Sequence, residues 1–277
     1  MTILALSSWV FLSAILAGLL GSLTGLGGGV VIVPVLTVLF HVDIRYAIGA
    51  SLVSVIATSS GAAAAYVREG FSNVRIGMFL EVATTLGALL GAWLTSRLPT
   101  HSIGIVFGCV LLYSAWASFR HKDHAGVDAP DPLATRLRLS GSYPTGHGEE
   151  HYTAQAVPAG FSLMFVAGTL SGLLGIGSGA VKVLAMDQAM KLPFKVSTTT
   201  SNFMIGVTAA ASAGVYLASG YIQPGLAMPV MLGVLAGSVV GTKLLARARV
   251  KTLRLVFAVV IVALGCEMIV NSVTGRL

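Results

Sequence analysis

Runs of about 20 apolar residues recur along the whole chain, and a helix of that length can cross the hydrocarbon core of a bilayer. Apolar residues make up 55% of the 277 positions and charged residues only 10%, whereas soluble domains carry about 25% charged residues. A β-barrel would show shorter segments that alternate between apolar and polar residues. The sequence therefore predicts an all-α polytopic membrane protein, and we expect it to cross the inner (cytoplasmic) membrane several times.

The N-terminal segment MTILALSSWVFLSAILAGLL lacks a basic start and a convincing small-residue cleavage site. We interpret it as a first membrane segment rather than as a removed signal peptide. Cys109 and Cys266 both lie in apolar runs, so they predict neither a disulfide nor a metal site. The net charge of +7 comes from basic residues between the apolar runs. Membrane topology explains that placement, so we expect no nucleic-acid partner.

The sequence repeats itself after 150 residues without a gap, so that AGLLGSLTGLGGGVVIV (17–33) aligns with AGTLSGLLGIGSGAVKV (167–183). The same shift also pairs polar residues with identical ones: Ser51 with Ser201, Tyr66 with Tyr216 and Arg97 with Arg247. Glycine and apolar matches alone could arise by chance in this composition, but a single register that also pairs tyrosines and arginines argues against chance. Duplicated halves are common in secondary transporters.

Each half begins with an apolar stretch, 3–40 or 158–190, that is too long for one membrane span and short for two at ~1.5 Å per residue. Glycines interrupt the middle of both stretches, so we predict a helical hairpin broken at the glycines. Three ordinary spans are expected after each hairpin: about 46–67, 75–96 and 102–119, and about 197–218, 225–246 and 252–272. The predicted divisions are a first transmembrane repeat (1–119), a polar cytoplasmic linker (120–157) and a second transmembrane repeat (158–277).

A hairpin plus three spans gives each half an odd number of crossings, which would invert one half relative to the other. In that arrangement, all but three of the lysines and arginines outside the membrane share one side, the exceptions being Arg45, Arg97 and Arg276. An even number of crossings would divide the basic loops almost evenly. The positive-inside rule therefore favours inverted repeats, with a cytoplasmic linker and both termini outside.

The clustered glycines mark the predicted binding site. Backbone at membrane depth leaves the helical ladder only where it is buried or lines a cavity. The free amides of the next helix N-terminus then attract an anion, with help from the helix dipole. The alternative is close helix packing through small residues, which we favour for scattered glycines such as Gly87 and Gly91. The candidates at the two breaks are Gly27, Gly28, Gly29, Gly177, Ser178 and Gly179.

Lys182 lies three residues after Gly179, about one helical turn into the second arm. Ionisable residues inside a membrane are expensive and usually functional. Asp187 would point about 140° away on the same helix and is better placed for Lys191. An anionic substrate could therefore supply the charge that Lys182 lacks. The first half has Ile32 at the matching position, so the predicted site is asymmetric.

Two alternatives remain for Lys182: it could extend its ammonium group to the interface, or it could pair with an acid of another helix, such as Glu81 or Glu267. Both glutamates, and Asp187, are also candidates for proton coupling. Helix capping explains one or two hydroxyls of the run KVSTTTSN (195–202), but not all of them. We expect the others to line a polar cavity. These further binding candidates are Thr199, Thr200, Ser201, Asn202 and Ser51, the repeat counterpart of Ser201.

The glycine segments GSLTGLGGGVVIVPVL (21–36) and GLLGIGSG (172–179), together with the ending GVLAGSVVGTKLLARARVKTLRLVFAVVI (233–261), resemble the sulfite exporter TauE/SafE family. This family is also called the toluene sulfonate uptake permease family. The resemblance covers nearly the whole chain apart from parts of the linker. It implies transport of sulfite, sulfonates or related sulfur-containing organic anions. The chain departs from the family pattern at Ser178, where a glycine is usual, and at Leu184, opposite Pro34 of the first half.

We therefore expect a secondary transporter of a small sulfur-containing anion, with the bilayer as its surroundings and protons as the candidate coupling ion. A channel-like pathway, or another small organic or inorganic anion as the substrate, is the alternative. A membrane enzyme is disfavoured because the sequence has no nucleophile–base constellation and no HExxH motif. No cofactor or metal is expected, since the linker histidines lack a tight ligand spacing. The segments RLRLSGSYP and EEHYTAQAV predict a small β-hairpin in the linker.

Overall fold

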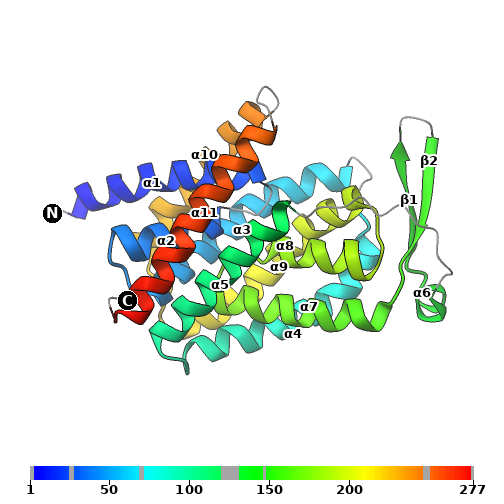
Figure 1. The fold of residues 1–277 in the computed structure, drawn as a ribbon, viewed down its shortest axis with the longest axis horizontal. Helices are drawn as coiled ribbons and strands as arrows, with labels where there is room; N and C mark the ends of the chain where they lie inside the picture. The colour runs from blue at the N-terminus through cyan, green and yellow to red at the C-terminus, as the bar shows by residue number, and fades with distance from the viewer. Residues whose placement is uncertain are drawn as a thin grey trace.

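The computed structural model describes residues 3–24, 28–68, 72–119, 131–145, 148–245 and 250–275, and these are mostly helical (Figure 1). Gly27, one of the predicted binding residues, lies outside them. The first half contains α1 (Ile3–Thr24), α2 (Gly29–Pro34), the π-helical turn η1 (Val35–Leu39), α3 (Ile44–Arg68), α4 (Val74–Thr95) and α5 (Thr100–Phe119). The second half contains α7 (Val157–Leu174), α8 (Gly179–Leu184), the π-helical turn η2 (Ala185–Ala189), α9 (Phe194–Ala218), α10 (Pro224–Leu245) and α11 (Val250–Val273).

The helix bounds follow the same 150-residue shift as the sequence. Adding 150 to the bounds of α2, η1, α3 and α4 gives the bounds of α8, η2, α9 and α10 without any offset. Each of the six predicted ordinary spans coincides with a helix to within a few residues. Two residues that the shift pairs are called repeat mates below.

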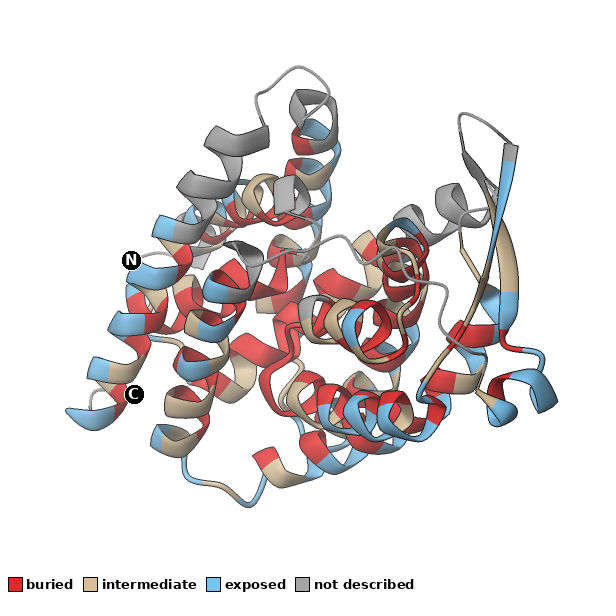
Figure 2. Cartoon of the chain, turned by 45° about the vertical axis from the view of Figure 1, so that its right-hand side comes forward, coloured by how far each residue is buried: buried red, intermediate tan, exposed pale blue. Residues whose placement is uncertain are grey.

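Several helices have the length and the apolar composition of membrane-spanning segments. Among the described residues, four helices are long and apolar enough to cross one: Val74–Thr95, Val157–Leu174, Phe194–Ala218 and Pro224–Gly241. Apolar side chains also lie on their outer faces; on α4 these include Met78, Val82, Leu86 and Trp93 (Figure 2). In water, such an exposed apolar stripe would be unusual, whereas lipid tails would cover it.

The helices of one half pack against those of the other rather than against their own neighbours in sequence. α1 lies along α10 and α4 along α7, while α3 packs on α9 and α5 on α11. Exchanging the halves turns the pair of α1 and α10 into the pair of α7 and α4. The contacts therefore have the pairing expected of two similar halves around a pseudo-twofold axis.

Scattered glycines let these helix pairs approach closely, as the sequence predicted for Gly87 and Gly91. A Cβ atom at Gly87 would collide with the carbonyl oxygen of Phe165, and one at Gly91 with that of Thr169. Gly237, the repeat mate of Gly87, makes the equivalent contact with Ile15 in the pair of α10 and α1. Small residues thus bring backbones together in both helix pairs.

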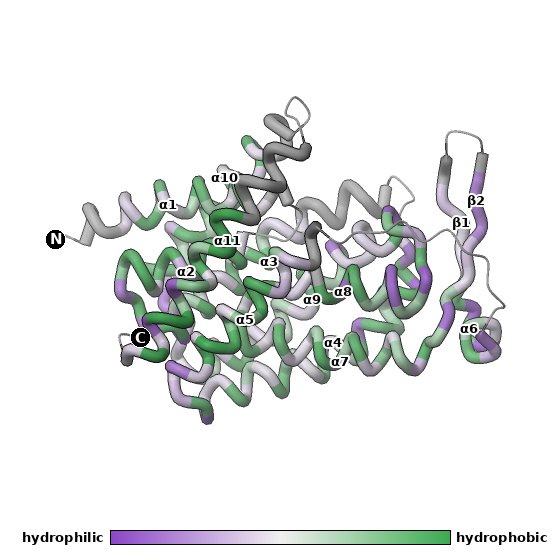
Figure 3. Tube along the Cα trace, in the orientation of Figure 1, coloured by the Kyte–Doolittle hydropathy of each residue, from purple (hydrophilic) through white to green (hydrophobic). Residues whose placement is uncertain are grey.

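The linker folds into a short helix and a β-hairpin. α6 (Pro132–Arg136) begins at Asp131, whose carboxylate accepts from the Leu133 amide. β1 (Ser140–Thr145) pairs antiparallel with β2 (Gly148–Thr153), which confirms the predicted hairpin. Polar residues gather around α6 and β2, whereas the bodies of the helices are mainly apolar (Figure 3).

The packing role of the glycines can be tested with one substitution at two places. Gly172→Ala would drive its Cβ into the Ala88 carbonyl oxygen between α7 and α4, and overpacking of this kind costs about 1–3 kcal/mol. Gly214→Ala on α9 meets no atom within 4 Å and serves as the matched control. We expect a lower melting temperature in detergent for the first variant alone. Equal melting temperatures would contradict the packing role.

Candidate functional site

The second helix break is a short segment of left-handed backbone. α7 ends at Leu174 with Gly175 (φ 65°) as its C-cap, and Gly177 (φ 71°) and Ser178 (φ 41°) follow before α8 begins at Gly179. Glycine adopts such angles at no steric cost, but serine does so less readily. The Ser178 hydroxyl donates to the Ala167 carbonyl of α7 at 2.6 Å, and this bond helps to hold the unusual conformation.

Two repeat-mate serines hold the break from opposite sides. Ser51 on α3 donates to the Gly175 carbonyl at 2.8 Å, and Ser201 on α9 donates to the Gly179 carbonyl at 3.3 Å. A Cβ at Gly29, the first residue of α2, would lie 2.6 Å from the Ser51 Oγ and 3.0 Å from the Gly175 oxygen. The start of α2 therefore lies directly against the break of the second half, so the structure brings together predicted residues from both repeats.

Lys182 of α8 is completely buried, and its partners come from two other helices. Its Nζ donates to the Thr208 Oγ1 of α9 at 2.6 Å. The Thr208 Oγ1 also lies 2.7 Å from Glu81 Oε1 on α4. The ammonium and the carboxylate attract each other across this hydroxyl. Glu81 is thus the acid of another helix that lies near Lys182, which was one of the two alternatives left by the sequence. We call Lys182, Thr208 and Glu81 the buried triad.

The Thr208 hydroxyl has a single proton, which limits what the buried triad can do. While it accepts from Lys182, it can donate either to Glu81 Oε1 or to the Met204 carbonyl, which lies 2.9 Å away. Glu81 Oε1 also accepts from Thr85 at 3.1 Å. Glu81 Oε2 is buried and has no hydrogen-bond partner within the described part of the chain. This oxygen is therefore the atom of the buried triad that is open to a proton.

The other proton-coupling candidates lie elsewhere. Glu267 is on an exposed position of α11, and Asp187 is buried on η2. The described residues contain no group of three or more His, Cys, Asp or Glu side chains that could hold a metal ion. Of the three acids predicted from the sequence as proton-coupling candidates, Glu81 is therefore the one that belongs to the buried triad.

The hydroxyl run at the start of α9 is used in two ways. Thr199 bonds back to the Lys195 carbonyl of its own helix. Thr200 instead accepts from the Asn73 amide at the start of α4, at 3.1 Å, and Asn202 is half-buried. Lining of a substrate cavity by these residues stays a prediction.

Thr208 is the functional candidate that sequence reasoning missed. It lies seven residues after Ser201, about two helical turns, and therefore on the same face of α9. This spacing is a signal that the sequence contains, but it does not reveal which charged groups the hydroxyl meets.

Removing the Thr208 hydroxyl should destabilise the protein. Thr208→Val keeps the shape of the side chain but removes the bridge between two charged groups, and such hydrogen bonds are worth about 1.5–3 kcal/mol. Ser212→Ala, one turn further along α9, removes a hydroxyl that donates to the Thr208 carbonyl at 3.1 Å and is the control. Thermal unfolding in detergent should show the larger loss for Thr208→Val. The opposite order would contradict a bridging role.

Comparison with known proteins gives a family and several relatives. A family model described as "Sulfite exporter TauE/SafE" matches residues 10–268. The chain is 28% identical over 273 residues to "Probable membrane transporter protein YunE" of Bacillus subtilis (strain 168), which covers 94% of this chain and 96% of the relative. It is 25% identical over 262 residues to a "Probable membrane transporter protein" of Xylella fastidiosa (strain 9a5c), covering 92% and 93% of the two chains. No solved structure matches.

Proposed function

The chain belongs to the sulfite exporter TauE/SafE family of membrane transporters, and on that basis we propose that it is a secondary transporter of a small sulfur-containing anion such as sulfite or a sulfonate. The observation that carries this proposal is a lysine with no exposed surface, Lys182, one turn after the break at which α8 begins. Ionisable side chains inside membrane proteins usually mark a substrate or ion pathway.

The repeat itself argues that the charges serve function rather than folding. The repeat mates of Lys182 and Glu81 are Ile32 and Met231, and the helices that carry them have the same bounds as their counterparts under the shift. The same arrangement of helices therefore forms without either charge. Buried ion pairs can often be replaced by apolar residues without loss of stability, so the pair has no evident structural purpose that two apolar residues would not meet.

The anion and the Glu81 carboxylate are alternative partners of Lys182 in this proposal. When Glu81 takes up a proton at Oε2, its carboxyl group becomes neutral and no longer neutralises the ammonium. An incoming anion then supplies the negative charge, with the amides at the start of α8 as further donors. Release of the proton from Glu81 restores the original pair and expels the anion. A proton would in this way be coupled to each anion bound.

We further propose that the halves are inverted repeats and that each break forms a hairpin near the middle of the membrane. The exchange of helix partners between the halves and the one-sided distribution of basic residues support this arrangement. Broken helices that meet at the midplane are the usual site of substrate binding in transporters built from inverted repeats.

A variant that gives both charged positions the residues of their repeat mates tests the anion site. In Lys182→Ile with Glu81→Met both charges are replaced by the apolar residues of the other half, Ile32 and Met231, so we expect normal thermal stability but loss of binding to sulfite and methanesulfonate. Lys182→Ile alone should bind no anion and should also lose about 3–5 kcal/mol, because Glu81 is left buried without its partner. Calorimetry and thermal unfolding on the same samples give both quantities.

Lys195→Ile is the control, since Lys195 is an exposed lysine at the start of α9; it should bind both anions like the parent protein. Binding of either anion by the double variant with the affinity of the parent would overturn the proposed site.

A further inference from the structure

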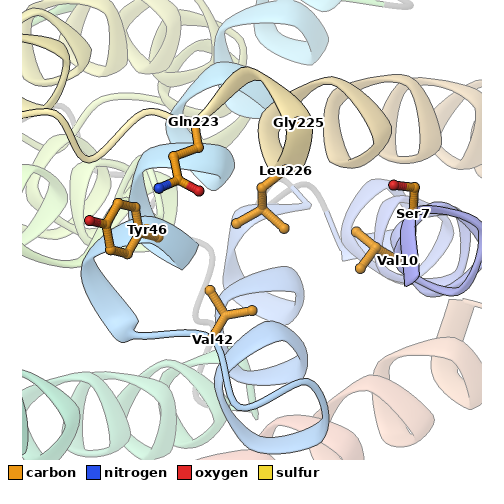
Figure 4. Close-up of a pocket in the computed structure, with 7 residues that line it drawn as sticks. All are labelled: Ser7, Val10, Val42, Tyr46, Gln223, Gly225 and Leu226. Atoms are coloured by element: carbon orange, nitrogen blue, oxygen red, sulfur yellow. The ribbon is translucent and has the colours of Figure 1, made fainter. Parts of the chain in front are cut away.

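A pocket of roughly 360 Å³ opens between the two halves, away from the linker. Its lining side chains come from α1, from the start of α3 and from the start of α10, as Figure 4 shows. They are Ser7, Val10, Val42, Tyr46, Gln223, Gly225 and Leu226. Val42 and Tyr46 are half-buried, and Gln223 is exposed, so the pocket is accessible from outside.

The 150-residue shift places an equivalent region on the side of the linker. The repeat mates of the lining residues are Val157, Gly160, Leu192, Val196, Asn73, Arg75 and Ile76. Leu192, the mate of the half-buried Val42, is only 1% exposed, and Ile76, the mate of the half-buried Leu226, is also 1% exposed. The same region of the fold is therefore open in one half and covered in the other.

The linker provides much of this cover. Ala134, Leu139 and Ala154 of the linker are each at most 1% exposed, and they share one apolar cluster with Ile76 and Leu192. Figure 2 shows the β-hairpin standing on this end of the molecule, with buried residues at its base. Linker side chains thus occupy a region whose counterpart in the other half is the pocket.

Hydrogen bonds fix the linker to the mates of two pocket-lining residues. Asn73, the mate of Gln223, donates from Nδ2 to the Tyr152 hydroxyl at 2.9 Å. Arg75, the mate of Gly225, donates to the Arg138 carbonyl at 3.4 Å. Burial raises the pKa of the Tyr152 phenol, although its bond with Asn73 lowers it. The phenol therefore keeps its proton at neutral pH and stays an uncharged acceptor.

We propose that the linker between the repeats is a gate. The pocket and its covered counterpart are the two mouths of the transport pathway, and the described linker residues, 131–145 and 148–155, close the second mouth. In the transport cycle the linker lifts from the start of α4, and the second mouth opens. The assignment of a pathway rests on the proposed function, whereas the closure itself is a property of the fold that can be measured without any substrate.

Thiol labelling in detergent tests the closure. In a background with Cys109 and Cys266 replaced by serine, Val42→Cys should react readily with a charged maleimide. Leu192→Cys, its repeat mate, should react about tenfold more slowly or worse, as expected for a site that is exposed only by local opening. Adding Leu139→Glu, which places a charge under the linker, should bring the Leu192→Cys rate close to that of Val42→Cys.

Leu137→Glu is the matched control, because Leu137 lies two residues away but is 42% exposed; it should leave the Leu192→Cys rate unchanged. The Val42→Cys rate should not respond to Leu139→Glu, which excludes general unfolding. A Leu192→Cys rate equal to that of Val42→Cys in the parent background, or one that Leu139→Glu leaves unchanged, would overturn the gate.

A reversible cross-link tests the role of the gate in transport. A Cβ at Gly141 in β1 would lie 2.7 Å from Asn73 Nδ2, so Gly141→Cys with Asn73→Cys can form a disulfide between the linker and the start of α4. Oxidation should stop methanesulfonate uptake into proteoliposomes, and a reductant should restore it. Asn73→Cys alone is the control.

Uptake that continues in the cross-linked protein would contradict the gate. If the parent protein moves no methanesulfonate or sulfite at all, the proposed substrate class is wrong, and the labelling result still decides whether the linker closes the second mouth.

Discussion

The hydroxyl group of Thr208 lies between Lys182 and Glu81 and contacts both of them. Both charged side chains are buried, so neither is in free contact with water. The three residues of the buried triad belong to α8, α4 and α9, so their geometry depends on how these helices pack. α4 is held against α7 by contacts of glycine with backbone, and α8 is positioned by the serines on either side of the break. A shift of any of these helices would separate the charges and leave each of them unsatisfied, which is expensive in a medium of low dielectric constant.

The two halves have helices at matching positions but differ in the charged side chains that these helices carry. α8 and α2 have matching bounds, and so do α9 and α3. α8 nevertheless has a lysine, Lys182, at the position where α2 has Ile32. The repeat mate of Thr208 is Thr58, whose hydroxyl, within the described part of the chain, bonds only to backbone carbonyls of its own helix, at Ser54 and Val55. A threonine at this position therefore fits both halves, and it becomes a bridge only where charged side chains approach it.

Much of the fold followed from the sequence, because helix length, glycine position and the internal repeat are all local or periodic signals. The helix starts at Gly29 and Gly179, the six helices at the positions of the ordinary spans and the linker hairpin were predictable on this basis. The partner of Lys182 was not, since Glu81 lies 101 positions away (182 minus 81) and Glu267 satisfied the same sequence criteria. Only the packing of α4 beside α9 distinguishes them. The packing of the linker against α4 could not be predicted either. Leu139 and Leu137 are the same residue type two positions apart, but Leu139 is buried in a cluster with Ile76 of α4, whereas Leu137 is exposed.

The proposed mechanism requires that an anion and the Glu81 carboxylate compete for Lys182. The most direct test is the affinity for methanesulfonate as a function of pH, because a sulfonate keeps its charge throughout the range in which a carboxyl group titrates. In this mechanism the affinity of the parent protein for methanesulfonate rises as the pH falls, since protonation of Glu81 releases Lys182. Glu81→Gln, which imitates the protonated form, should bind tightly at every pH. An affinity of Glu81→Gln that follows the same pH dependence as the parent, or that is lost altogether, would contradict the claim.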